Sequence, residues 1–170
     1  MSPIVSIIMG STSDMPIMEA AAKYLNDMQI PFEINALSAH RTPDLVADFA
    51  KNAASRGIKV IIAAAGGAAH LPGVIAASTT LPVIGVPIKA SMSMDGWDSI
   101  LSIIQMPPGI PVATVGINAA QNAAILATQI LAVADAEIGK KVAARKAALA
   151  EKITKANEDL KQIKFDYKTN

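Results

Sequence analysis

Short runs of buried-type residues alternate with helical patterns along most of the chain, and this alternation constrains the fold more than any other feature. The first run, Ile4–Met9, is almost continuously β-branched, as expected of a parallel strand covered on both faces. Further strands are predicted at Phe32–Leu37, Val60–Ala65, Pro82–Val86 and Ile110–Val115, and helices at Asp14–Met28, Thr42–Gly57, Val74–Ser78 and Ser99–Met106. Because parallel neighbours need crossovers, the pattern predicts a doubly wound α/β domain around a five-stranded parallel sheet.

The composition narrows the class of protein. A chain of 170 residues with 52% hydrophobic residues can form one domain with a sizeable core. With a net charge of +1 and 17% charged residues, the chain lacks the excess of positive charge typical of proteins that bind nucleic acid or an anionic membrane. No window is long and apolar enough to span a membrane, and the N-terminal apolar run has strand length and no basic leader. The absence of cysteine excludes disulfides and thiolate chemistry and fits the reducing cytoplasm.

The last third of the chain has a different pattern. Residues 119–136 form a helical run that is apolar nearly all round, which predicts burial on several sides. Beyond Asp135, a second run places one apolar stripe among lysine, arginine and glutamate side chains. A single layered domain has little place for both helices. We therefore expect them to pack on neighbouring subunits rather than on their own domain.

Four loop segments directly follow the predicted strands. They are Gly10–Asp14, Ser38–Arg41, Gly66–Gly73 and Pro87–Asp98. Ligands of doubly wound folds bind beyond the carboxyl ends of the strands, where such loops meet. We therefore expect the four segments to surround one crevice.

The loop Gly10–Asp14 combines glycine, hydroxyl side chains and a predicted helix start, which suits a phosphate. The alternative to ligand binding is a purely structural role, in which Ser13 or Asp14 caps the helix. A carboxylate beside a phosphate is unfavourable unless it accepts a hydrogen bond from another group, such as a sugar hydroxyl. A phosphorylated sugar or a nucleotide satisfies both requirements. The sequence contains neither G-x-G-x-x-G, the usual dinucleotide-binding motif, nor G-x-x-x-x-G-K-[ST], the usual ATP-binding motif.

Both histidines of the chain, His40 and His70, lie in these loops. An imidazole exchanges protons near neutral pH, so His40 is a candidate proton carrier. Its neighbour Arg41 can bind a phosphate or carboxylate through two parallel hydrogen bonds, or can pair with Asp44 or Asp48 in the next helix. Thr42 is expected to cap that helix. His70 could orient a ligand or serve the structure. Two histidines without clustered acids make a metal site improbable.

Five motifs in order resemble the PurE family of purine biosynthesis, from about Ile4 to Ala134. They are G-S-T-S-D (Gly10–Asp14), S-A-H-R-T-P (Ser38–Pro43), A-G-G-A-A-H-L-P-G (Ala65–Gly73), G-V-P (Gly85–Pro87) and the segment Asp98–Val115. The resemblance implies a flavodoxin-like three-layer sandwich, a homo-octamer, and a ribonucleotide substrate without metal or organic cofactor. We expect a single domain, 1–170, with an α/β core at 1–117 and intersubunit helices at 118–170. The segment Gly116–Asn122 is shorter and less glycine-rich than in bacterial members.

The resemblance also implies roles for single residues. His40 matches the catalytic histidine, and the substrate-binding residues are expected to be Ser11, Ser13, Asp14, Ser38, Ala39, Arg41, Gly66, Ala68 and His70. The connection through Ser91, Ser93, Gly96 and Trp97 resembles that of the bacterial-type enzymes. These enzymes are mutases, which move a carboxyl group from the exocyclic nitrogen of an aminoimidazole ribonucleotide to ring atom C4. Freed CO2 would be held in the small-residue pocket of Gly66–Gly73 while His40 handles the proton at carbon.

Three alternatives remain open from the sequence. The first is direct carboxylation of aminoimidazole ribonucleotide with CO2, as in the animal-type enzymes. The second is a flavodoxin-like module that binds flavin mononucleotide, although only 4% of the residues are aromatic and Trp97 is the one large stacking platform. The third is a non-catalytic interaction protein built around the C-terminal helices.

Overall fold

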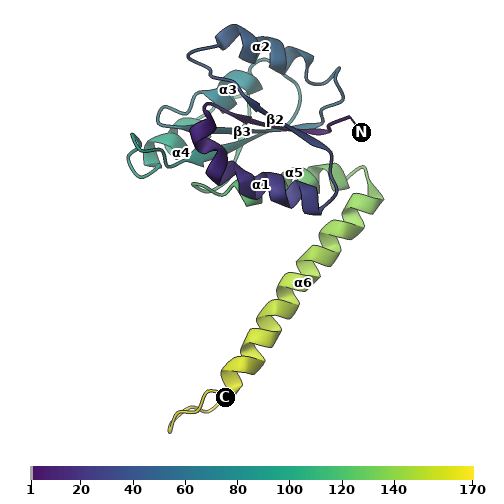
Figure 1. Ribbon diagram of the computed structural model, residues 1–170, viewed down its shortest axis with the longest axis vertical. Coiled ribbons are helices and arrows are strands. Elements are labelled where there is room, and N and C mark those ends of the chain that lie inside the picture. The colour runs from purple at the N-terminus through teal and green to yellow at the C-terminus, as the bar shows by residue number, and fades with distance from the viewer. Residues whose placement is uncertain (1) are drawn as a thin grey trace.

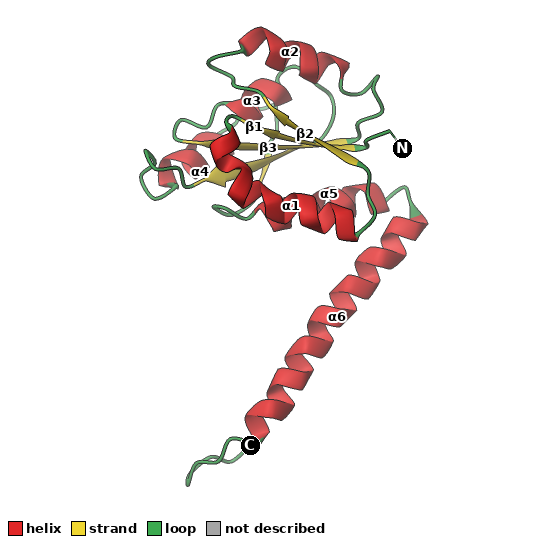
Figure 2. Ribbon diagram, in the orientation of Figure 1, coloured by secondary structure: helices red, strands yellow, loops and turns green. Residues whose placement is uncertain are grey.

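A five-stranded, all-parallel sheet forms the centre of the computed structural model, which describes residues 2–170 (Figures 1 and 2). The strands are β1 (Val5–Met9), β2 (Phe32–Ala36), β3 (Val60–Gly66), β4 (Val83–Ile88) and β5 (Ala113–Thr114). The helices are the 3-10 turn η1 (Thr12–Asp14), α1 (Met15–Asp27), α2 (Pro43–Asn52), α3 (Leu71–Ala76), α4 (Trp97–Ile104), α5 (Ala120–Ala132) and α6 (Ala136–Lys161). The sheet order is β2-β1-β3-β4-β5, so the predicted doubly wound α/β fold is confirmed.

The two faces of the sheet carry separate hydrophobic clusters, because successive strand residues point to opposite sides. In β3, Val60, Ile62 and Ala64 join one cluster, and Ile61 and Ala63 join the other. Strand β3 is therefore buried on both faces, which explains its continuous apolar run in the sequence. Each large aliphatic side chain buried in this way stabilises the fold by about 1.5–3 kcal/mol before the entropic cost of ordering.

Helices cover both faces and give three layers. Helices α1 and α5 pack together on one face, and α2, α3 and α4 lie on the other, as Figure 1 shows for α1 and α5 below the sheet and α2 and α3 above it. Helix α5 contacts β3 and β4, and its buried alanines share one hydrophobic cluster with the strands: Ala120, Ala123, Ala124 and Ala127. It thus belongs to the α/β layers of its own subunit, beyond the boundary expected at residue 117. Small side chains allow this close approach to the sheet.

Several predicted boundaries were wrong, and helix α2 ends at Asn52 rather than at Gly57. Helix α3 begins at Leu71 rather than Val74, because Pro72 fits a first helical turn. Helix α4 begins at Trp97 rather than Ser99, after Gly96 in a left-handed conformation (φ 86°). Strand β5 pairs with β4 only at Ala113–Thr114, whereas Ile110–Val115 was expected. Pro111 lies in the missing part, and a proline has no N–H to donate to the ladder.

Helix α6 leaves the domain as an arm of 26 residues, about 39 Å long (Figure 1). Ile138 and Val142 near its start pack against the α1/α5 core, and Lys141 Nζ donates to the Met28 carbonyl at 3.0 Å. The distal apolar stripe is exposed: Leu149, Ile153 and Leu160. No residue of α6 is buried within the subunit. Within residues 2–170, no helix has both the length and the apolar character that a membrane crossing requires.

Candidate active site

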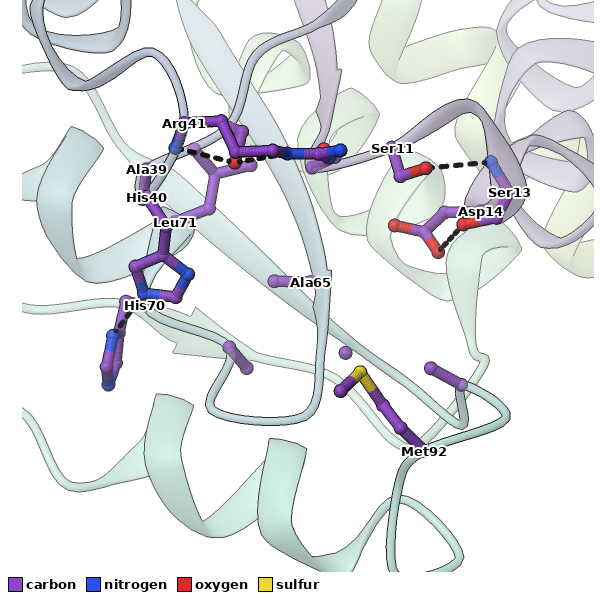
Figure 3. A pocket seen from close by; sticks show the side chains of 15 residues that line it. Ser11, Ser13, Asp14, Ala39, His40, Arg41, Ala65, His70, Leu71 and Met92 are labelled. Atoms are coloured by element: carbon purple, nitrogen blue, oxygen red, sulfur yellow. Dashed lines mark hydrogen bonds between the residues drawn. The ribbon is translucent and has the colours of Figure 1, made fainter.

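One cavity of about 320 Å3 lies where the loops after β1, β2 and β3 meet the connection after β4 (Figure 3). The sheet order brings these strand ends together. Nine of the ten predicted site residues line the cavity, namely Ser11, Ser13, Asp14, Ser38, Ala39, His40, Arg41, Gly66 and His70. The volume lies at the lower end of the range for ligand pockets, about 300–1,000 Å3.

The loop after β1 presents hydroxyls and a buried carboxyl group to the cavity. Ser11 caps the turn η1, since its Oγ accepts from the Ser13 N–H at 3.3 Å. Asp14, at the end of η1, is only 7% exposed, and the Ser13 hydroxyl donates to its Oδ1 at 3.3 Å. Burial raises the pKa of the Asp14 carboxyl, and the Ser13 hydrogen bond partly offsets this effect. A buried acceptor at a cavity wall is suited to a ligand hydroxyl that donates to it.

The Arg41 side chain spans the loops after β1 and β2. Its Nη2 donates to the Gly10 carbonyl at 2.7 Å, and its backbone N–H and Nε donate to Ser38 Oγ at 3.2 and 3.3 Å. Within residues 2–170, no carboxylate pairs with Arg41, so the expected alternatives Asp44 and Asp48 are not its partners. A guanidinium carries five N–H donors, and three remain for an anion in the cavity.

Thr42 locks the turn that carries the histidine. Its hydroxyl accepts from the Ser38 N–H at 3.0 Å and donates to the Ser38 carbonyl at 3.1 Å, and its own N–H donates to the same carbonyl at 2.9 Å. Thr42 occupies the N-cap position of α2, as predicted, but the expected hydrogen bond from its hydroxyl to the helix is absent. The closed turn fixes His40 at its tip.

His40 and His70 contact each other directly. His40 Nε2 lies 2.7 Å from His70 Nδ1, and the two rings meet edge to face at 85° (Figure 3). One proton lies between these two nitrogens, so the tautomer of one ring determines that of the other. Both rings are exposed at the cavity edge. The arrangement can pass a proton to or from a ligand while keeping the imidazole oriented.

Small side chains from β3 and the loop that follows it form a further wall of the cavity. Ala65, Gly66 and Ala69 line the cavity, and a Cβ on Gly66 would lie 2.8 Å from the Ala90 Cβ. Glycine is therefore needed where the ends of β3 and β4 approach. Ala68 does not line the cavity: the backbone turns through positive φ at Gly67 (62°) and Ala69 (46°), which leaves Ala68 exposed at the outer tip.

The sequence interpretation missed some lining residues. Gly10 contributes its carbonyl to Arg41, and Leu71 lies at the start of α3. Ala90 and Met92 come from the long connection after β4. An apolar side chain in a polar loop, as at Met92, was the available signal. No group of three or more His, Cys, Asp or Glu side chains that could hold a metal ion occurs in the described part of the chain.

Comparison with known proteins gives consistent matches. The family model described as AIR carboxylase matches residues 4–152. An N5-carboxyaminoimidazole ribonucleotide mutase of Pyrococcus abyssi is 56% identical over 160 residues, covering 94% of this chain and 85% of its own. A phosphoribosylaminoimidazole carboxylase of Schizosaccharomyces pombe is 61% identical over 131 residues, but they cover 77% of this chain and only 24% of its own. The crystal structure of Treponema denticola PurE superposes with a TM-score of 0.84 at 33% identity, covering 94% of this chain and 99% of that one.

Proposed function

The chain belongs to the AIR carboxylase (PurE) family, and we propose that it is an N5-carboxyaminoimidazole ribonucleotide mutase of purine biosynthesis. The enzyme moves a carboxyl group from the exocyclic nitrogen to C4 of the imidazole ring. The observation that carries this function is one cavity in which an arginine, a buried carboxyl group and a pair of imidazoles face a wall of alanine and glycine. Such a cavity offers sites for a phosphate, a sugar hydroxyl, a mobile proton and a small neutral intermediate.

The ribonucleotide is held by its phosphate and ribose. Arg41 binds the phosphate with its remaining donors, assisted by the hydroxyls of Ser11, Ser13 and Ser38. Asp14 accepts a hydrogen bond from a ribose hydroxyl, which gives the buried carboxylate a second donor beside the Ser13 hydroxyl. These contacts position the imidazole ring toward His40 and the alanine and glycine wall.

The carboxyl transfer then takes place in two steps. The C–N bond of the carbamate breaks, the nitrogen keeps the electron pair and takes a proton from the His40 imidazolium, and CO2 forms. The C4 electron pair next forms a bond to the carbon of CO2, and the C4 proton passes to His40. No proton is gained or lost overall. The wall of Ala65, Gly66 and Ala69 holds CO2 beside the ring during the exchange.

The remaining predicted residues have supporting roles. His70 holds the ring of His40 through their shared hydrogen bond. Ala39 and Gly66 line the cavity and leave space for the imidazole. Ala68 has no place in this arrangement, since it lies outside the cavity.

The second candidate is direct carboxylation of aminoimidazole ribonucleotide with CO2, favoured by the 61% identity to the fungal carboxylase. This chain spans about a quarter of that protein's length, whereas it matches most of the Pyrococcus mutase. Purified protein should be incubated with the N5-carboxylated ribonucleotide and, separately, with aminoimidazole ribonucleotide plus bicarbonate. Efficient turnover only in the second mixture would overturn the mutase assignment. A His40→Asn variant should keep ribonucleotide binding and lose turnover.

We further propose that the protein works as a homo-octamer in the cytoplasm. Support comes from the exposed apolar stripe of α6 and from Trp97 and Leu101 on α4, which are 63% and 52% exposed. The absence of cysteine fits a reducing compartment. Native mass spectrometry at micromolar concentration should give eight copies, and a monomer would contradict the proposal.

A further inference from the structure

Met92 is the one lining residue that combines a long apolar side chain with almost complete exposure. It follows β4, lines the cavity together with Ala90, and is 85% exposed. Figure 3 shows it across the cavity from Arg41 and away from the histidine pair. A large apolar side chain in water at the mouth of a cavity can gain burial when a ligand enters.

The backbone around Met92 is held, whereas its side chain is free. The Ser93 N–H donates to the Ala90 carbonyl at 3.0 Å and closes a turn that contains Met92. The Ser93 hydroxyl donates to Asp98 Oδ1 at 2.7 Å and accepts from the Gly96 N–H at 2.7 Å. Methionine is unbranched and has three rotatable bonds, so it adapts to irregular surfaces. The turn therefore presents an adjustable apolar side chain at a fixed place on the rim.

The reaction needs such an element. Arg41 and Asp14 can hold the charged and hydroxylated parts of the ribonucleotide, but CO2 carries no charge and offers them little. Apolar walls and the exclusion of water help to keep such a small neutral molecule in place. Ala65 and Gly66 form one wall next to Ala90, and the turn at Met92 borders the same part of the cavity.

We propose that Met92 closes over the bound imidazole and retains CO2 between its release from nitrogen and its addition to C4. This role rests on the mutase function. Met92 takes no part in the proton transfer and does not bind the phosphate. It determines which fraction of the released CO2 is captured at C4 and which fraction escapes to leave aminoimidazole ribonucleotide.

The test follows the carboxyl carbon. Substrate carrying 13C in its N5-carboxyl group is converted in buffer with unlabelled bicarbonate, and the first turnovers are corrected for the uncatalysed decay of the carbamate. Label in the 4-carboxylated product and free aminoimidazole ribonucleotide are measured for the full-length wild-type protein, Met92→Ala, Met92→Leu and Met94→Ala. Met94 lies in the same loop, is 71% exposed and does not line the cavity, so it is the matched control.

We expect Met92→Ala to lose label about five-fold more often per turnover than wild type, equivalent to about 1 kcal/mol. Met92→Leu should restore retention, and Met94→Ala should match wild type. If Met92→Ala turns over the substrate and retains label as wild type does, the retention role is wrong and the mutase function stands. If wild type does not convert the N5-carboxylated ribonucleotide at all, the mutase function and the role of Met92 are both wrong.

Discussion

Replacing Asp14 by asparagine should stabilise the unliganded protein at neutral pH and weaken ribonucleotide binding. The carboxyl is nearly buried, its hydrogen bond from Ser13 is long at 3.3 Å, and burial raises its pKa. A folded-state pKa above the unfolded value means that folding favours the protonated form. The resulting stabilisation is full below the unfolded pKa and is lost as the pH rises through the folded pKa. At neutral pH the wild type therefore holds a poorly compensated carboxylate, and the amide removes that charge.

The size of each effect follows from the surroundings of Asp14. The site borders water, so we expect a gain of about 1 kcal/mol in the free energy of unfolding, well below the cost of a fully enclosed charge. For a chain of this length this raises Tm by about 2–4 °C. In the complex, a charge-assisted hydrogen bond to ribose is worth about 1.5–3 kcal/mol, so Kd should rise by about 10- to 150-fold.

Thermal unfolding of wild type and Asp14→Asn between about pH 4 and pH 8 tests the stability effect. The difference in Tm should shrink as the pH falls and Asp14 becomes protonated. Calorimetric titration with aminoimidazole ribonucleotide tests the binding effect. Asp44→Asn, at an exposed acid in the first turn of α2, is the control and should give no gain. A variant that melts at or below the wild-type Tm at pH 7, with the same pH dependence, would refute this reasoning.

Three other changes have specific expected results. Gly66→Ala adds a Cβ 2.8 Å from the Ala90 Cβ and narrows the cavity beside the imidazole ring. Steady-state assays should therefore show a loss of kcat with little change in ribonucleotide Kd. An unchanged kcat would contradict the role of this wall. Arg56→Ala removes donors 2.8 and 3.0 Å from the Glu33 carboxylate, which lower the pKa of Glu33. Urea unfolding should show a loss of about 1 kcal/mol at neutral pH that fades as the pH falls through the lowered pKa, and an equal loss at all pH values would disprove the linkage. His70→Asn removes the ring partner 2.7 Å from His40, so kcat should fall and its pH profile should move while ribonucleotide Kd is kept; an unaltered profile would leave His70 without a positioning role.

The strands and their alternation with helices followed from the sequence where local pattern decides structure. β1 and β3 are runs of aliphatic residues buried on both faces, and no tertiary detail is needed to recognise them. β5 was overestimated because its length depends on which backbone N–H groups reach β4, and Pro111 removes one. α5 was assigned to neighbouring subunits because an all-round apolar helix indicates burial but does not identify the partner; its alanines contact their own sheet.

The site was predictable to the level of loops and less so to the level of contacts. Parallel topology brings the loop of His40 and the loop of His70 to one edge, and the sequence pattern contains that information. The 2.7 Å contact between the rings depends on side-chain conformations thirty positions apart in the chain. Thr42 was assigned to the wrong partner because a hydroxyl before a proline suits both a helix cap and a closed turn. Met92 was missed because Met92 and Met94 stand in the same polar loop, and nothing periodic in the sequence tells which of them lines the cavity.

The positions of the cavity and of the α6 arm restrict how one can affect the other. The cavity lies at the N-terminal end of α1, beside Asp14, whereas α6 is anchored through Lys141 to Met28 at the C-terminal end of that helix. The thirteen residues of α1 separate these ends by about 20 Å, and α6 runs further from the sheet (Figure 1). The distal stripe at Leu149 and Ile153 therefore cannot reach the cavity of its own subunit. We therefore expect a truncation before Leu149 to lower turnover through a neighbouring subunit, with an effect that grows as the protein is diluted. A loss independent of concentration would exclude this route and point to the truncated subunit itself.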